Sequence, residues 1–172
     1  MFNNKRIVLR PIALKDSLDI FEYRSDAEAN KYQGWVPKSI EDTNAYILKN
    51  PKSFNTPNSW FQLVIVLNDT GKVIGDIGVH FIDEYQCELG CTLHKAYQGN
   101  GYAQESLKLV IDYLFTELNK HRITASIDPR NSSSVRLFEK LNFRKEAHFK
   151  ESLFFKGEWV DDVVYACLKP EW

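Results

Sequence analysis

Gln98-Gly99-Asn100-Gly101-Tyr102-Ala103 is the stretch of sequence that decides the fold. It follows residues 88–93, which have the pattern of a strand, and it opens a segment whose apolar residues recur at helical spacing. One face of that predicted helix carries Ala103, Leu107, Val110, Ile111, Leu114, Phe115 and Leu118. The stretch therefore predicts a tight turn between a strand and a long amphipathic helix.

Small residues at such a turn favour anion binding. Gly99 and Gly101 let the backbone approach a ligand closely, and the free N–H groups of the first helical turn, together with the helix dipole, suit a pyrophosphate. A Rossmann fingerprint would need Gly or Ala where Gln104 stands, and a P-loop would need a following Gly-Lys-Ser/Thr. A plain tight turn with a glycine N-cap fits the same residues, so both interpretations stay open at this point.

The rest of the chain predicts a mixed α/β fold. Strand patterns occur at residues 6–11, 60–67, 73–82, 88–93 and 123–127, and twice more within 145–168 around a turn at 156–158. Helical periodicity predicts further helices over 13–24, 39–49 and 132–141. Ser39 is placed to cap the second helix, and Asn142 to end the last one in the left-handed conformation. In this order, parallel pairing is possible only across the two late helices.

The composition is that of a globular protein, and we expect one domain over residues 1–172. Hydrophobic residues make up 44% of the chain, and 22 Lys and Arg balance 23 Asp and Glu. This balance argues against nucleic acid as a partner. We expect no membrane span or signal peptide, because no apolar run is long enough and the first residues are polar. The odd set of three cysteines, Cys87, Cys91 and Cys167, fits the reducing cytoplasm. The four histidines lack metal-ligand spacing, so no metal is expected.

Several separated motifs resemble the GNAT acetyltransferase superfamily. The pattern Gln-x-x-Gly-x-Ala at residues 98–103 is followed by Asn131-Ser132-Ser133-Ser134 and by Leu-Phe-Glu-Lys-Leu-Asn-Phe at 137–143. Arg-Ile-Val-Leu-Arg-Pro at 6–11, Glu-Leu-Gly-Cys-Thr-Leu at 88–93 and Gly-Glu-Trp-Val-Asp at 157–161 are similar to the RimJ/RimL-type branch, which acetylates N-terminal amines of ribosomal proteins. The resemblance spans nearly the whole chain in the same order.

The resemblance implies a GNAT fold: a mostly antiparallel central sheet with one parallel pair splayed into a V, flanked by about four helices. It implies that acetyl-CoA lies in the gap between strands 88–93 and 123–127. The backbone at 99–103 would hold the pyrophosphate, the first strand would pair with the pantetheine arm, Asn131 and Ser134 would hydrogen-bond that arm, and Phe138 would lie against it. The cofactor-binding residues implied in this way are Cys91, Thr92, Leu93, Gln98, Gly99, Asn100, Gly101, Tyr102, Ala103, Asn131, Ser134 and Phe138.

The implied chemistry is acyl transfer from a thioester to an amine. A protonated amine must lose a proton before attack, so a base is needed, and the departing thiolate benefits from an acid. A backbone N–H of Cys91 or Thr92 would stabilise the oxyanion. The sequence departs from the superfamily's commonest pattern, because Phe138 stands where a Tyr acid is common and Ser126 where some relatives carry a Glu base.

We therefore assign the acid role to Ser134, as in the RimL-type branch. The first candidate for the base is Glu88, since it lies on the strand that should line the acetyl site. A solvent-facing strand residue without such a role is the alternative for Glu88.

The interpretation is a cytoplasmic N-acetyltransferase that moves acetyl directly to a primary amine, in particular a protein N-terminal amine, without a metal. One alternative is a small-molecule enzyme that acts on polyamines or aminoglycosides. Another is a CoA-binding regulatory module with weak turnover, which Phe138 and Ser126 motivate. Relatives often dimerise, so a homodimer is possible. The early aromatic residues Tyr32, Trp35 and Phe54 are expected either to form an acceptor wall or to pack beside the core.

Overall fold

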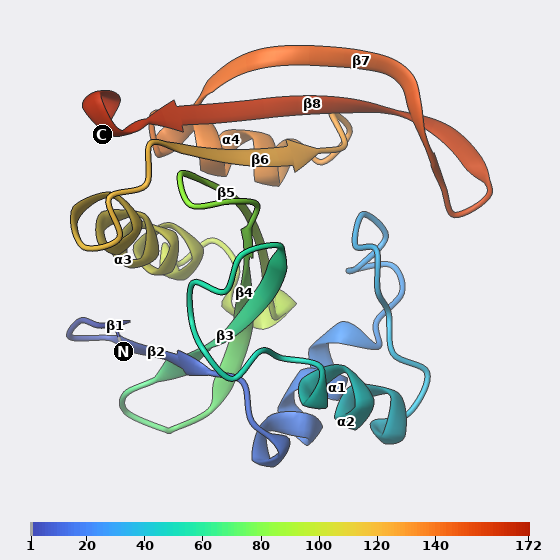
Figure 1. Ribbon diagram of the computed structural model, residues 1–172. Helices are drawn as coiled ribbons and strands as arrows, with labels where there is room; N and C mark the ends of the chain where they lie inside the picture. Colours follow the sequence, from blue (N-terminus) through green and yellow to red (C-terminus); the bar gives the residue numbers. More distant parts are fainter. Residues whose placement is uncertain (1) are drawn as a thin grey trace.

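The computed structural model describes residues 2–172. The strands are β1 (Phe2–Asn3), β2 (Ile7–Pro11), β3 (Ser59–Leu67), β4 (Val73–Phe81), β5 (Gln86–Leu93), β6 (Arg122–Ile127), β7 (Arg144–Phe155) and β8 (Glu158–Leu168). The helices are α1 (Ser17–Arg24), α2 (Ile40–Leu48), α3 (Tyr102–Thr116) and α4 (Ser132–Lys140), with 3-10 turns η1 (Leu14–Asp16), η2 (Lys95–Tyr97) and η3 (Lys169–Glu171). The strands form one sheet in the order β1-β2-β3-β4-β5-β6-β8-β7 (Figure 1).

The sheet contains a fork between β5 and β6. These two strands pair in parallel, whereas the other neighbouring strands pair antiparallel. The parallel register joins Gln86 to Arg122, Cys87 to Ile123 and Glu88 to Thr124, although both strands continue beyond it. Beyond Glu88 the two strands therefore part. This arrangement confirms the expected fold, a mostly antiparallel sheet with one splayed parallel pair and four helices.

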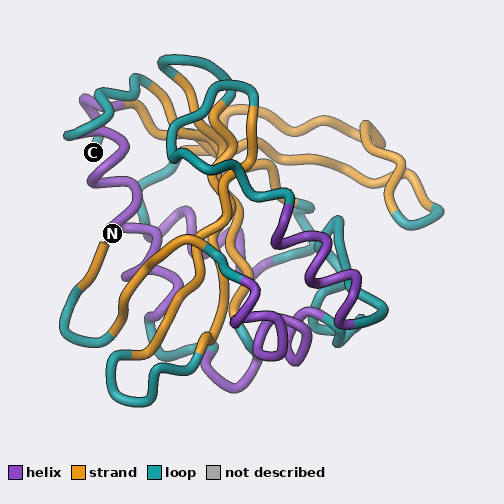
Figure 2. Tube along the Cα trace, turned by 60° about the horizontal axis from the view of Figure 1, so that its bottom comes forward, coloured by secondary structure: helices purple, strands orange, loops and turns teal. Residues whose placement is uncertain are grey.

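Helices cover both faces of the sheet. The larger core joins the sheet to α3 and α4, with Leu107, Val110, Ile111 and Leu114 of α3 fully buried. A smaller core joins α1 and α2 to Val64 and other residues of β3 and β4 on the opposite face. Figure 1 shows the two pairs of helices apart from each other, and Figure 2 shows the β7–β8 hairpin extending away from the rest of the sheet.

Local sequence signals account for the start of α2 and the end of α4. The Ser39 hydroxyl accepts the backbone N–H of Asp42 at the start of α2, and Asn142 has a φ of 61° after α4. The predicted helix over 13–24 instead begins as η1. There the Asp16 carboxylate accepts the backbone N–H of Ala13 and one N–H from each of the two terminal guanidinium nitrogens of Arg10. The sequence pattern does not predict the short strand β1, because two residues carry no periodicity.

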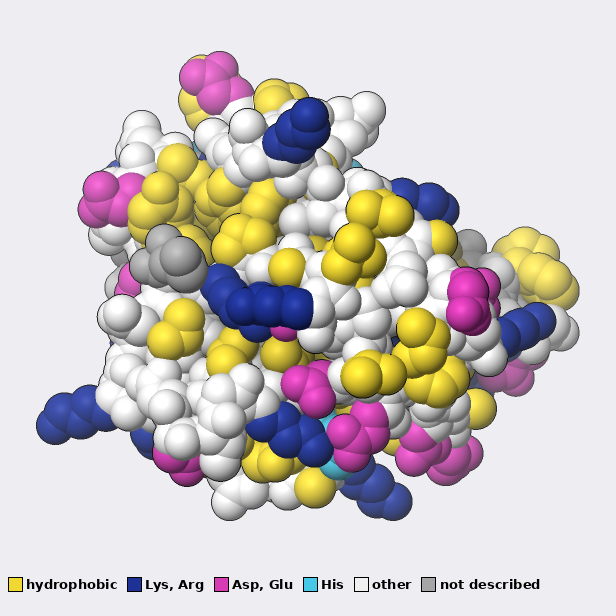
Figure 3. All heavy atoms as spheres, turned by 90° about the horizontal axis from the view of Figure 1, so that it is seen from below, with side chains coloured by type: hydrophobic (Ala, Val, Ile, Leu, Met, Phe, Trp, Pro, Cys, Tyr) yellow, Lys and Arg dark blue, Asp and Glu magenta, His cyan; other side chains and the backbone are white. Residues whose placement is uncertain are grey.

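The described surface carries charges of both signs. On the face in Figure 3, Lys and Arg side chains lie among Asp and Glu side chains and apolar patches. No helix within residues 2–172 is long and apolar enough to cross a membrane.

Candidate active site

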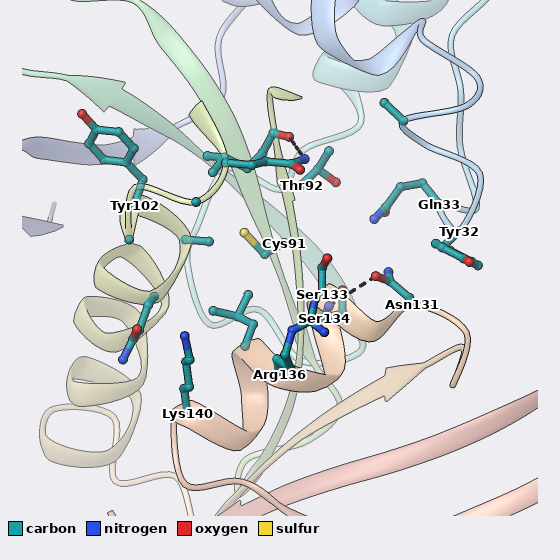
Figure 4. A pocket seen from close by; sticks show the side chains of 18 of the residues that line it. Tyr32, Gln33, Cys91, Thr92, Tyr102, Asn131, Ser133, Ser134, Arg136 and Lys140 are labelled. Carbon is teal, nitrogen blue, oxygen red and sulfur yellow. Dashed lines mark hydrogen bonds between the residues drawn. The ribbon is translucent and has the colours of Figure 1, made fainter. Parts of the chain in front are cut away.

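A cavity of about 520 Å³ opens at the fork. Its walls come from four places in the chain: the loop after α1, the end of β5, the turn and first residues of α3, and one side of α4 (Figure 4). The lining residues are Glu28, Ala29, Lys31, Tyr32, Gln33, Cys91, Thr92, Leu93, Gln98, Gly99, Gly101, Tyr102, Ala103, Gln104, Asn131, Ser133, Ser134, Arg136, Leu137 and Lys140. The cavity thus brings the end of β5 and the Gly-rich turn together with the start of α4, which lies far from them in the sequence.

The mouth of α3 is open and built from glycine. Gly99 and Gly101 have φ of 78° and 84°, a left-handed conformation that other residues adopt only with strain. A Cβ at Gly99 would meet no atom within 4 Å, and one at Gly101 only the Glu105 carboxylate at 3.7 Å. In the described chain no side chain caps α3. The first-turn amides of α3 are therefore available for an anion.

Arg6 braces this turn from the start of the chain. Its guanidinium donates to Glu105 Oε1 at 2.7 Å and to the Asn100 carbonyl at 3.0 Å, and it lies 4.0 Å above the Tyr102 ring. These contacts give Arg6, the first residue of the motif at 6–11, a structural role. Arg6 joins the start of β2 to the turn at the edge of the cavity.

The end of β5 presents a backbone edge that no further strand of the described chain covers, although the Leu93 carbonyl accepts the Gln98 side-chain amide at 3.0 Å. Cys91, Thr92 and Leu93 pair with β4 on one side, and within the described residues β6 pairs with β5 only as far as Glu88. Free N–H and C=O groups on such an edge can pair with an extended ligand. Burial raises the pKa of the Cys91 thiol to about 12, so this cysteine stays protonated near neutral pH and behaves as a buried apolar residue.

Helix α4 directs polar and basic side chains into the cavity. Asn131 caps the helix, because its Oδ1 accepts the N–H of Ser134 at 3.2 Å. Arg136 and Lys140, one turn apart, both line the cavity, and neither takes part in an ion pair among residues 2–172. Sequence reasoning missed this basic pair, although its i,i+4 spacing next to Ser134 is a visible signal.

Most of the predicted cofactor residues line the cavity, namely Cys91, Thr92, Leu93, Gln98, Gly99, Gly101, Tyr102, Ala103, Asn131 and Ser134. Asn100 lies outside the lining, and its side-chain amide donates to the carbonyl groups of Tyr97 and Gln98. Phe138 is only 3% exposed and packs edge-on against Phe143 in the core. Their cofactor contacts remain predictions.

Glu88 also lies outside the cavity lining, at the apex of the fork. Its Oε2 is 3.8 Å from Nδ1 of His80. Burial, with a further contribution from the charge of Asp162, raises the pKa of the Glu88 carboxyl, whereas His80 opposes the shift. A carboxylate held in this way is a stronger proton acceptor than a solvated one.

The loop that closes the cavity is fixed at three points. Asp76 of β4 accepts the Tyr23 hydroxyl at 2.6 Å and forms a buried ion pair with Arg24, which anchors the end of α1. Beyond α1, the Tyr32 hydroxyl donates to the Arg130 carbonyl at 3.2 Å, next to the cap of α4. Lys156, from the β7–β8 turn, donates to the carbonyl groups of Asn30 and Lys31.

Comparison with known proteins identifies similar sequences along the whole chain. The model of the acetyltransferase (GNAT) domain family matches residues 6–144. An uncharacterized N-acetyltransferase of Bacillus subtilis, YnaD, is 34% identical over 172 residues, which cover 98% of this chain and 96% of the relative. The ribosomal protein uS5 alanine N-acetyltransferase of Escherichia coli is 35% identical over 88 residues, which cover 51% of this chain and 45% of the relative.

Solved structures share the fold. The crystal structure of a GNAT-family acetyltransferase from Bacillus anthracis matches with a TM-score of 0.90 at 30% identity, covering 99% of both chains. A spermidine N-acetyltransferase from Vibrio cholerae, solved in complex with CoA and spermine, matches with a TM-score of 0.83 at 22% identity, covering 98% of each chain. At that identity the second likeness concerns the fold alone.

Proposed function

The chain belongs to the GNAT acetyltransferase family and is an acetyl-CoA-dependent acetyltransferase, and from that premise we propose that its acceptor is the α-amino group of a protein N-terminus. The acetyl-CoA part of the proposal rests on the fork, where an open β5 edge meets a cavity with free amides at one end and a basic pair at another. Acetyl-CoA has an extended arm, a diphosphate and a further phosphate, and these residues fit each part. The acceptor part rests on the partial likeness to the uS5 alanine acetyltransferase.

In this proposal the cavity residues divide the binding of acetyl-CoA among them. The amides of residues 99–103 bind the diphosphate, and Arg136 and Lys140 contribute positive charge toward the phosphates. The edge of β5 at residues 91–93 pairs with the pantetheine arm, and Asn131 and Ser134 hydrogen-bond it. When bound, acetyl-CoA supplies an acetyl thioester at the fork.

In this proposal, side chains and backbone groups of the protein carry out the proton transfers and stabilise the oxyanion. Glu88 takes a proton from the acceptor ammonium, so that the amine gains a free lone pair. A backbone N–H of Cys91 or Thr92 stabilises the oxyanion. The Ser134 hydroxyl, which lines the cavity, protonates the departing thiolate. No acyl-enzyme forms in this scheme, because the amine attacks directly.

An α-amine suits this site because its pKa, near 8, leaves part of it neutral at physiological pH, whereas a side-chain amine near 10 is almost fully charged. The partial likeness to the uS5 alanine acetyltransferase also supports an α-amine acceptor.

A polyamine is the second candidate acceptor. The Glu88 and Asp162 carboxylates are close enough for Asp162 to raise the pKa of Glu88 beyond the effect of burial, and such a pair attracts a multiply charged amine.

The proposal includes a cytoplasmic location and a single domain. Cys87, Cys91 and Cys167 are all free thiols, which fits a reducing compartment, and one continuous sheet runs through the described chain. A homodimer remains a prediction that light scattering would check.

The test is a thiol-release assay with purified protein and acetyl-CoA. We expect rapid CoA release with peptides that carry a free N-terminal alanine or serine, and none with the same peptides acetylated at the N-terminus. Spermidine and an aminoglycoside complete the panel. Release with spermidine alone would exclude the protein N-terminus, and CoA binding by calorimetry without release for any amine would favour the regulatory module.

A further inference from the structure

Three side chains form a row across the sheet that ends at the fork. Trp60 of β3 is the cross-strand partner of His80 of β4, and His80 is the partner of Glu88 of β5. Because side chains alternate along a strand, these three point away from the core under α3, into which the neighbouring Phe61 and Phe81 are buried. The row therefore lies on the face that carries α1 and α2.

The members of this row are in contact. The Trp60 indole stacks on the His80 imidazole, with ring centroids 4.8 Å apart and planes 9° from parallel. His80 Nδ1 is 3.8 Å from the Glu88 carboxylate. Gly78 makes the stack possible, since a Cβ there would lie 3.1 Å from two carbons of the indole ring. One face of the imidazole is thus covered, and its Nδ1 is the ring atom that lies within ion-pair distance of the carboxylate.

Open space lies beyond the carboxylate. Glu88 is the last β5 residue paired with β6, and at Gly90, the next position on the same face, a Cβ would meet no atom within 4 Å. The His80 side chain is 25% exposed and that of Glu88 30%, so the pair is partly desolvated but still touches water.

The groups that face Glu88 come from several strands. The titratable ones are His80 from β4 and Asp162 from β8. Strand β6 presents Thr124, the cross-strand partner of Glu88, and Ser126, whose hydroxyl donates to Asp162 at 2.7 Å. Strand β3 presents the Trp60 ring, beside His80. In the described chain His80 is the basic group that pairs with Glu88.

We propose that His80 is a positioning residue for acetyl transfer: it holds the Glu88 carboxylate at the fork and relays to water the proton that Glu88 removes from the acceptor, while Trp60 fixes the imidazole plane. This inference rests on the proposed function, in which Glu88 is the base. It adds two residues, Trp60 and His80, that bind neither the cofactor nor the acceptor.

The proton balance of the step is complete. The acceptor ammonium R–NH3+ loses one N–H proton to Glu88, which passes it through His80 to water. The nitrogen lone pair forms the C–N bond, the C–S bond breaks, and its electron pair leaves on sulfur. The Ser134 hydroxyl gives its proton to the sulfur, and the second N–H proton of the amine replaces it on Ser134 as the amide forms. One ammonium and one thioester thus give one amide, one thiol and one proton in solution.

The test compares His80→Gln with wild type and with a control, His121→Gln, which is exposed immediately before β6 and lies outside the row. Acetylation of an N-terminal alanine peptide and of spermidine is followed from pH 6.5 to 9.5. We expect His80→Gln to lower kcat at least tenfold near pH 7, with the KM for acetyl-CoA within about twofold. The deficit should shrink as pH rises, because more of the amine loses its proton in solution. His121→Gln should match wild type.

The outcomes separate the inference from the function on which it rests. An unchanged kcat of His80→Gln would overturn the relay, and so would a kcat lowered by the same factor at every pH. Either result would leave the acetyltransferase activity in place. If wild type acetylates neither amine, the proposed function fails and the inference fails with it.

If His80→Gln does not fold, Trp60→Leu is the variant to test, since it removes the stacked ring and leaves the imidazole. For that variant we expect a kcat loss of about threefold or more with the same pH trend, and a loss independent of pH would overturn the proposal.

Discussion

At the scale of single residues, substitutions at two glycines with similar backbone conformations can distinguish an effect on CoA binding from an effect on stability. Gly101 at the mouth of α3 has a φ of 84°, and Gly71 in the β3–β4 turn has a φ of 70° with no atom within 4 Å of an added Cβ. We expect Gly101→Val and Gly71→Val to cost similar stability, about 1–3 kcal/mol, because each strains the backbone without a steric clash. Only Gly101→Val should weaken CoA binding, by tenfold or more in a calorimetric titration. Equal CoA affinity in both variants would remove the diphosphate from this turn.

The acid role proposed for Ser134 can be tested against Ser132, which lies in the same turn of α4. Ser134 lines the cavity, whereas Ser132 of the same helix is exposed outside the lining. Ser134→Ala keeps the backbone N–H that Asn131 accepts, so the cap of α4 stays intact. We expect kcat to fall about tenfold to a hundredfold and the affinity for CoA to change little, because a proton donor to the thiolate is lost. Steady-state kinetics beside Ser132→Ala check this, and an unchanged kcat in Ser134→Ala would end the acid assignment.

Single residues also show where sequence reasoning stops. The spacing of Ser39 and of Asn142 predicted two helix ends, because caps depend on atoms close in the chain. Arg6, in contrast, contacts Asn100 and Glu105, a contact that only the folded sheet creates. The spacing of Arg136 and Lys140 places both on one face of α4, but whether that face lines the cavity depends on how α4 packs.

At the scale of elements, a buried ion pair holds α1 against β4. The Asp76 carboxylate accepts from Arg24 Nε at 2.9 Å and from the Tyr23 hydroxyl, and all three residues are nearly inaccessible. Asp76→Asn leaves the Arg24 charge buried without a counter-charge, and we expect a loss of about 3 kcal/mol in the free energy of unfolding. Urea denaturation measures it, with Asp69→Asn in the exposed β3–β4 turn as the control. A loss below about 1 kcal/mol for Asp76→Asn would mean that the charge finds another partner.

The order of elements was predictable along the chain but not across the sheet. The strand and helix patterns predicted the order of the longer elements and limited parallel pairing to the two late helices. The parallel pair across α3 itself was implied by the family resemblance. The patterns did not indicate that β8 lies between β6 and β7, since antiparallel pairing permits either neighbour. This placement matters for the site, because it brings Asp162 of β8 beside Ser126 and toward Glu88.

At the scale of the whole molecule, the cavity and the Trp60–His80–Glu88 row meet at the fork, although their residues lie far apart in the sequence. The cavity with the free amides of α3 and the basic pair of α4 opens at the fork, and the Trp60–His80–Glu88 row reaches the apex of the same fork on the face that carries α1 and α2. A cofactor that enters by the cavity and an acceptor that enters by the opposite face would meet where β5 and β6 part. This geometry explains why Glu88 lies outside the cavity lining and still serves as the proposed base.

The same arrangement predicts how ligands stabilise the fold. CoA at a hundred times its Kd should add about 2.7 kcal/mol to the stability of the protein, which for a chain of this length raises Tm by roughly 5–10 °C. Pantetheine, which lacks the phosphates, should give a much smaller shift at the same concentration, because the α3 amides, Arg136 and Lys140 have no anion to bind. Raising NaCl from 0.05 to 0.5 M should reduce the CoA shift, since Arg136 and Lys140 are exposed and their charges are screened. Thermal melts of wild type and Gly101→Val, each with CoA, pantetheine or neither, check all three expectations. An equal shift from pantetheine, or a CoA shift independent of salt, would contradict the assignment of the phosphates to the mouth of α3 and the basic side of α4.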